Sequence, residues 1–302
     1  PVYALCSLHP SFTLRCLTDD APVFAMPDDD KWPDFFAEYA AFLQEFQDLG
    51  RPRGIRFNKA KSFLLLPPSA PDPAPGVLPD WVQVVRDGLV IAGAAIGTDD
   101  FVIQHFTQAV EDYGLSLAKL DDLSHVKPVC GMVLLGRCFT KVLSYLVRVT
   151  PTVLVSSLIE RADALTAAAR YAALTPEGVS GPDCTDGRLH RADAVAALPL
   201  RSGGFGHTPL ALSAPGAFYS SLALAREEGA FCALAGALDD YLLDAHTRLI
   251  QAVGGPSGVI AGSNLAVILP IDASRVCERG FFLDIFSKHP KLKVEATLSR
   301  AV

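Results

Sequence analysis

Two adjacent carboxylates, Asp19 and Asp20, lie in the tetrapeptide L-T-D-D between two runs of strand-forming residues. The pattern over residues 12–26 predicts a β-hairpin with an acidic tip. Oxygen ligands of this kind suit Mg²⁺, and a hairpin tip can present them to substrate phosphates in two-metal phosphoryl transfer. Turns are also rich in Asp because its side chain bonds the local backbone, so a structural role for the pair stays open.

A second chemical feature is a run of eleven residues, 51–61, that contains five cations and no acid. The cations are Arg51, Arg53, Arg56, Lys59 and Lys61. Such a segment can contact phosphates in a sequence-independent and salt-sensitive way. It can equally be a charged edge that discourages strand pairing, and both interpretations stay open.

Between these two features, a period of three to four residues predicts an amphipathic helix that ends at Gly50 and Pro52. Asp34 and the aspartates at 28–30 lie around its start, where we expect a capping or dipole role. Its apolar positions are Phe35, Phe36, Tyr39, Phe42, Leu43, Phe46 and Leu49.

Beyond this helix, the sequence pattern is first that of extended chain and then that of helices. We expect an extended segment over 54–66, a surface loop over the six prolines of 67–79, and a hairpin around Asp87-Gly88. From Thr98 onward the pattern is helical, Pro151 separates two helices, and residues 174–187 are the best linker candidate. We therefore expect three structural regions, which comprise residues 1–97, 98–173 and 188–302.

Composition limits the class of protein. With 302 residues, half of them hydrophobic, the chain can bury a large core. Its net charge of -7 gives no global basic field, so nucleic-acid contact would depend on a local patch. The seven scattered cysteines have no zinc-ligand spacing and predict buried, reduced thiols. Without a signal-peptide pattern or a long apolar span, we expect an intracellular protein of cytoplasm or nucleus, with no membrane partner.

The order of these elements resembles the palm of reverse transcriptases from their Y-x-D-D hairpin onward. After the hairpin and one helix, G-I-R-F-N-K-A-K-S at 54–62 is similar to the family's G-L-x-x-N-x-x-K-S element. Then G-A-A-I-G-T-D-D-F at 93–101 is similar to the G-x-P-I-G-x-x-x-F segment of retroelement polymerases. Finally, L-P-L-R-S-G-G-F-G at 198–206 resembles their L-P-x-x-x-G-G-x-G signature. Together the four elements cover roughly residues 12–225.

The resemblance implies an α+β fold: a small antiparallel palm-like sheet with a packed helix over 1–97, then a mainly helical, thumb-like region. It implies an RNA-directed DNA polymerase that uses Mg²⁺, with Asp19 as a metal ligand and Asp20 beside it in a metal-binding or structural role. Lys61 would lie near the incoming triphosphate, where an ammonium can neutralise the leaving pyrophosphate.

The partners implied are an RNA template and a DNA primer. The cations that we expect to contact them are Arg51, Arg53, Arg56 and Lys59. A solvated lysine remains the alternative for Lys61.

The chain departs from the family pattern in two ways. Leu17 and Thr18 stand where the family has an aromatic and a small residue. A palm also needs a third carboxylate and a nucleotide-pocket segment upstream, and only eighteen residues precede Asp19. We therefore expect an incomplete active site in this chain and a missing N-terminal polymerase half, encoded upstream of Pro1. The alternative is a non-catalytic descendant that binds nucleic acid or protein.

Overall fold

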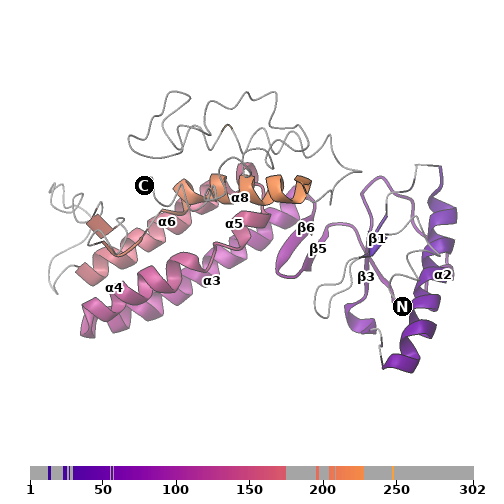
Figure 1. Cartoon of the computed structure of the whole chain (residues 1–302), viewed down its shortest axis with the longest axis horizontal. Coiled ribbons are helices and arrows are strands. Elements are labelled where there is room, and N and C mark those ends of the chain that lie inside the picture. The colour runs from indigo at the N-terminus through magenta and orange to yellow at the C-terminus, as the bar shows by residue number, and fades with distance from the viewer. Residues whose placement is uncertain are drawn as a thin grey trace. The chain divides into compact units, whose positions relative to one another are not determined.

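A computed structural model of the chain describes part of its length. The described residues are 13–14, 23–25, 27, 30–54, 56, 58–174, 195–196, 204–207, 209–227 and 247. They form a mixed structure of helices and short strands, most of it helical (Figure 1). The chain divides into two units, Pro1–Val102 and Ile103–Val302.

The first unit is organised around α2, Trp32–Gly50, which confirms the helix predicted from periodicity. Its aromatic side chains recur every three or four residues, so they form one stripe of neighbouring rings from Trp32 to Phe46. Pro33 lies in the first turn, where its missing N–H costs no hydrogen bond. The N-cap is Lys31 and no side chain caps the helix, so Asp30 does not cap it, whereas Asp34 lies in the first turn, where the helix dipole favours a negative charge. Asp28 and Asp29 lie outside the described residues.

The stripe of α2 is buried against extended segments from both sides of it in the sequence. Strands β1 (Thr13–Leu14) and β2 (Val23–Phe24) pair antiparallel, which confirms the pairing of the predicted acidic hairpin. Leu64 of β3 (Phe63–Leu65) belongs to the buried cluster that contains this stripe, and Val23 packs against that cluster. The hairpin and the segment that follows the basic run therefore share one hydrophobic core.

Strand pairing differs from the single antiparallel sheet that the sequence predicts. β3 pairs in parallel with β4 (Gln83–Val85), and the described strands form three separate two-stranded sheets. The proline-rich loop makes the crossover, and its Ala70 is buried in the α2 core. Arg86 stabilises this loop, because its guanidinium donates hydrogen bonds to the Asp72 carboxylate at 2.6 Å and to the Pro67 carbonyl oxygen at 3.1 Å.

The predicted hairpin around Asp87-Gly88 is also wrong. The actual hairpin joins β5 (Gly88–Ile91) to β6 (Ala94–Gly97) through Ala92 and Gly93, whose φ angles are 50° and 83°. Two positive φ values are what a two-residue type I′ turn requires. Gly88 instead allows its backbone to pack closely on its neighbours, because a Cβ there would collide with the Phe101 ring and the Ile96 carbonyl.

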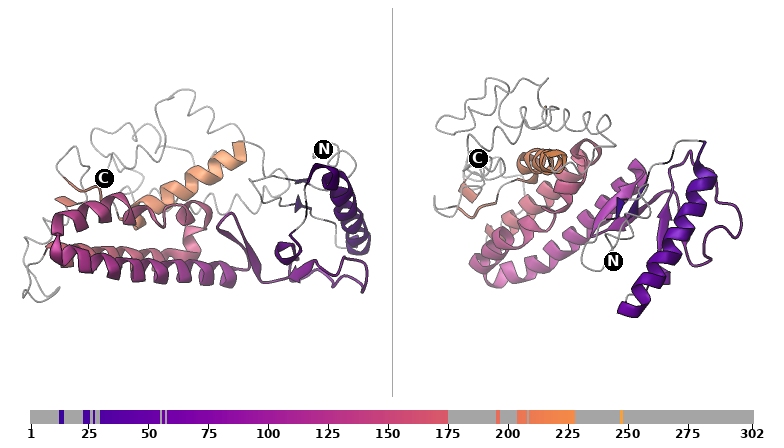
Figure 2. Two further views of the ribbon diagram at one scale, coloured as in Figure 1. Left: turned by 90° about the horizontal axis from the view of Figure 1, so that it is seen from below. Right: turned by 45° about the vertical axis from the view of Figure 1, so that its right-hand side comes forward.

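The second unit is a bundle of helices, as Figure 2 shows. Its main helices are α3 (Asp99–Val126), α4 (Pro128–Arg137), α5 (Leu146–Val149), α6 (Thr152–Leu174) and α8 (Leu210–Glu227). Pro151 separates α5 from α6, as predicted. Helices from residues 98–173 and from the region beyond 188 bury side chains in the same core, for example Phe106 of α3 and Ala214 of α8.

Two expectations about the surface have different outcomes. Cys130 and Cys138, the free cysteines of the described residues, are exposed, so their expected burial is wrong. Within the same part of the chain, no helix combines the length and the apolar character needed to cross a bilayer. The linker predicted over 174–187 lies outside the described residues, except for Leu174 at the end of α6.

The corrected hairpin predicts a stabilising substitution. Ala92 adopts a left-handed conformation that Asn tolerates better than Ala, so Ala92→Asn is expected to stabilise the first unit by about 0.5–1 kcal/mol. Chemical denaturation measures this change. The matched control is Asp87→Asn, which places Asn before Gly at the position that does not form the turn and is expected to give no gain; stabilisation by the control alone contradicts the observed pairing.

Candidate nucleic-acid interface

The acidic half of the predicted site is only partly located. Asp19 and Asp20, predicted as metal ligands and catalytic residues, lie outside the described residues. The two strands that flank them are described, and β2 is anchored by Val23 on the α2 core. In the described part of the chain, no three His, Cys, Asp or Glu side chains gather closely enough to hold a metal ion.

The basic half of the site, residues 51–61, is largely described. Arg51 and Arg53 lie in the 3-10 helix η1 (Arg51–Arg53), which ends at Gly54 in a left-handed conformation with a φ of 78°. Arg51, Arg56, Lys59 and Lys61 are all exposed, while the side chain of Arg53 is outside the described set. None of the four exposed cations pairs with an acid among the described residues. These four charges are therefore available to an anionic partner.

The lysines occupy a turn, which corrects the extended segment predicted over 54–66. Lys59 and Lys61 lie in the 3-10 helix η2 (Lys59–Lys61), and only Phe63–Leu65 forms a strand. Asn58 explains the difference, because its Oδ1 accepts a hydrogen bond from the Ala60 N–H at 3.2 Å and its carbonyl accepts one from the Ser62 hydroxyl at 3.0 Å. Such local bonds compete with strand pairing.

The glycine-rich segment around residues 203–206 has a structural position in the second unit. Gly204 is buried, and the N–H groups of Phe205 and His207 both donate to the Ala196 carbonyl at 3.1 Å. The His207 ring is buried as well, with Nε2 3.2 Å from the Met132 carbonyl of α4. This segment therefore packs closely on α4.

The N-terminus of α8, which follows this segment, is occupied by a side chain of the protein itself. Asp163 of α6 accepts hydrogen bonds from the N–H groups of Leu210 at 2.6 Å and Ala211 at 2.8 Å. A phosphate loop would need these same donors, so the geometry excludes that role for them. Burial raises the pKa of Asp163 above its ordinary value, although the two backbone hydrogen bonds and Arg170 act in the opposite direction.

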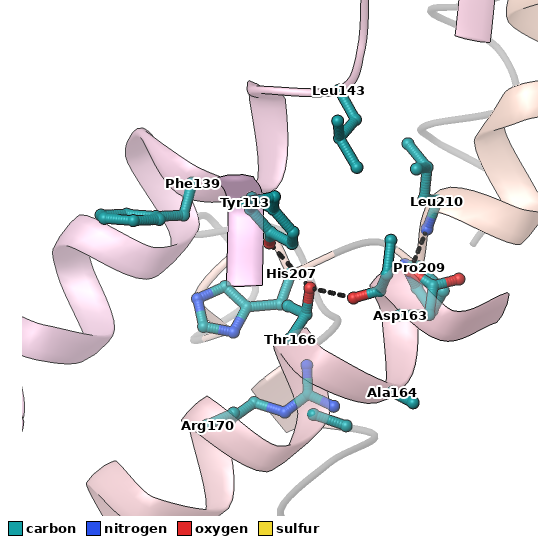
Figure 3. Close-up of a pocket in the computed structure, with 12 residues that line it drawn as sticks. Tyr113, Phe139, Leu143, Asp163, Ala164, Thr166, Arg170, His207, Pro209 and Leu210 are labelled. Carbon is teal, nitrogen blue, oxygen red and sulfur yellow. Dashed lines mark hydrogen bonds between the residues drawn. The ribbon is translucent and has the colours of Figure 1, made fainter. Parts of the chain in front are cut away.

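A pocket of about 270 Å³ lies beside this cap, between α3, α6 and the segment before α8 (Figure 3). On its wall, Tyr113 Oη and Thr166 Oγ1 are 2.8 Å apart, and Arg170 is also a lining residue although it is almost fully buried. Sequence reasoning missed these residues because it described 98–173 only as a helical pattern and singled out no polar positions within it. Asp163, Thr166 and Arg170 lie at i, i+3 and i+7, and this spacing could have indicated a polar stripe on α6.

Comparison of the chain with protein-family models, with curated proteins and with solved structures finds no match. The chemistry assigned to this chain therefore depends on its own residues.

The close packing on α4 predicts opposite effects at two helical glycines. A Cβ at Gly136 would lie 2.5 Å from the Phe205 carbonyl oxygen and 2.7 Å from His207 Nε2, so Gly136→Ala is expected to cost about 1–3 kcal/mol of unfolding free energy. At Gly114 of α3, the nearest atom to a Cβ is Leu165 Cδ1 at 3.4 Å, which is ordinary contact.

Gly114→Ala is therefore the control, and it is expected to be neutral or to stabilise by about 0.5–1 kcal/mol, because Ala favours a helix over Gly. Thermal and chemical unfolding of the two variants measure the difference. Equal stability of both would mean that the segment over 204–207 does not pack on α4 as described.

Proposed function

We propose that this chain is part of a reverse-transcriptase-like polymerase, comprising the end of a palm and a thumb-like helical region. In this proposal Asp19 and Asp20 belong to a two-metal nucleotidyl-transfer site, and the basic segment contacts the RNA template and DNA primer. The observation that supports it best is the exposure of Arg51, Arg56, Lys59 and Lys61 on a segment that enters the same core as the acidic hairpin.

Only short stretches of chain separate the proposed site residues from residues of the hydrophobic core. Asp20 precedes Val23 by three residues, and Lys61 precedes Leu64 by three. Three residues span at most about 11 Å. Because Leu64 belongs to the buried cluster and Val23 packs against that same cluster, the proposal brings the carboxylates and the lysine to one region without any further element.

The argument from charge concerns the local field. The chain as a whole is acidic, and a uniform acidic surface would repel a nucleic acid. Interactions between exposed charges fall off over about 8 Å at physiological salt, so an acid-free cluster acts on a phosphate backbone largely by itself. Contacts between these cations and phosphates would bind template and primer without sequence preference.

The binding part of the proposal predicts a defined salt dependence. Lys59→Gln with Lys61→Gln is expected to weaken binding of an RNA–DNA hybrid and to reduce the slope of log affinity against log salt by about 0.9 for each phosphate that is no longer neutralised. Titrations at several salt concentrations measure the slope. Lys119→Gln with Arg161→Gln, two exposed cations of the second unit, is the matched control, and equal losses of affinity in both double variants would contradict a specific role for the basic segment.

A non-catalytic module that binds nucleic acid or protein is the second candidate. The acidic net charge and the residues Leu17 and Thr18, which depart from the pattern of the family it resembles, favour it. This candidate shares the binding prediction but not the chemistry, so an assay of synthesis separates the two.

The catalytic part of the proposal concerns Asp19. In the natural protein that carries this segment, Asp19→Ala is expected to abolish Mg²⁺-dependent primer extension, because a metal ligand is removed, while hybrid binding stays within about twofold. Asp87→Ala is the control, since Asp87 is exposed between β4 and β5, and it is expected to retain synthesis. Hybrid binding without any synthesis that depends on Asp19 would support the non-catalytic candidate.

A further inference from the structure

Helix α4 is apolar on all sides, yet only one side of it is buried. Its sequence, PVCGMVLLGR, contains a single charged residue, Arg137. Gly131, Met132, Leu135 and Gly136 face the bundle and are buried. A helix that is hydrophobic all round is ordinarily covered all round.

The opposite side of α4 lies open to solvent in the described structure. Val129 is 73% exposed, Val133 46% and Leu134 36%, and Cys130 and Cys138 are exposed beside them. We call these five residues the α4 outer face. Positions 129 and 133 are one helical turn apart, as are 130 and 134, so the face forms a continuous stripe.

The charged residues of α4 and of the segment that follows it have one sign. Lys127 directly precedes α4, Arg137 is its last residue, Lys141 follows in η3 (Phe139–Lys141), and all three are exposed. The stretch 127–159 has four cations and no acid, in a chain of net charge -7. Lys127 also stands at the positive end of the helix dipole, and the first turn of α4 has no acidic residue and no side-chain cap.

We propose that the α4 outer face is a docking surface for an acidic amphipathic helix of a partner protein. The apolar stripe of the partner covers Val129 and Val133, and its carboxylates pair with Lys127 and Arg137. These two cations are ten residues apart, which corresponds to about 15 Å along the helix. The partner thus needs acidic groups at two ends of a stripe of about three helical turns.

Two other kinds of anionic partner fit this surface less well. Helices that lie on membranes bury Trp, Phe and Leu side chains, whereas the most exposed apolar side chains here are short valines. The backbone of a nucleic acid is densely charged and would leave the valines between the cations without apolar cover. An apolar stripe between two cations is complementary to an apolar stripe between two carboxylates.

The probe is a synthetic helical peptide of about 18 residues with leucines along one face and glutamates at both ends of that face. A matched peptide has lysine in place of each glutamate. Fluorescence anisotropy measures binding to the full chain, and thiol labelling followed by mass spectrometry measures protection of Cys130 and Cys138. The glutamate peptide is expected to bind saturably and to slow labelling of both cysteines, whereas the lysine peptide is expected to do neither.

Two variants locate the binding. Val133→Glu is expected to weaken binding of the glutamate peptide about tenfold or more, because it places a carboxylate in the apolar contact. Val90→Glu is the control, since Val90 is 48% exposed on β5 of the other unit, and it is expected to bind as the unchanged chain does. Lys127→Glu with Arg137→Glu is expected to reverse the preference in favour of the lysine peptide. If Val133→Glu does not fold, this double variant is the test of the docking surface.

The proposal is overturned if the two peptides bind equally, if Val133→Glu and Val90→Glu bind alike, or if Cys130 and Cys138 stay unprotected at saturation. It is also overturned in favour of a different partner if anionic phosphatidylserine vesicles or an RNA–DNA hybrid protect these cysteines while the glutamate peptide does not. None of these readouts depends on polymerase activity, so they leave the proposed function untouched.

Discussion

Burial of the aromatic stripe of α2 is the interaction on which the arrangement of the first unit depends. The described strands of this unit are two to four residues long and pair two by two, so their backbone hydrogen bonds cannot hold a sheet together by themselves. Phe42 is 1% exposed and Leu66 1%, and these two side chains belong to the cluster that also contains Leu64 and contacts Val23. Segments distant in sequence are therefore brought together by side-chain packing, and the short ladders form where packing allows.

Glycine has two different roles in this chain, one set by the local backbone conformation and one by a neighbour distant in sequence. At Gly93 the backbone itself requires a positive φ, and the residue beside it, Ala92, gives no strong turn signal. At Gly88 and Gly136 the requirement comes from a neighbour remote in sequence, the Phe101 ring in one case and the Phe205 carbonyl in the other. An Asp-Gly pair is a frequent turn signal, but Gly88 is used for close packing, which is why the sequence pattern indicated the wrong hairpin.

Periodicity predicted the long elements because it reports burial along one helix. It located α2 and the start of α3, whereas the break between α5 and α6 was predicted from Pro151. Strand partners could not be predicted in the same way, since a run such as Phe63–Leu65 carries no information on whether its partner lies before it or after it. The same holds for the candidate site, whose cations at 51–61 were evident in the sequence. The turn that carries Lys59 and Lys61 was not, because it depends on local hydrogen bonds of Asn58 that compete with an extended conformation of the same residues.

The distribution of charge connects the two proposals. Net charge is a sum, but an exposed side chain acts over about 8 Å at physiological salt. Within an acidic chain, the segments 51–61 and 127–159 are both free of acid, and they differ in what accompanies the cations. In 51–61 the described cations are exposed on a turn, with polar Asn58 between Arg56 and the lysines. On α4 an exposed apolar stripe lies between the cations. A dense cluster of cations suits a phosphate backbone, whereas separated cations with valines between them suit the acidic, apolar surface of a folded partner, so one sign of charge provides two distinct specificities.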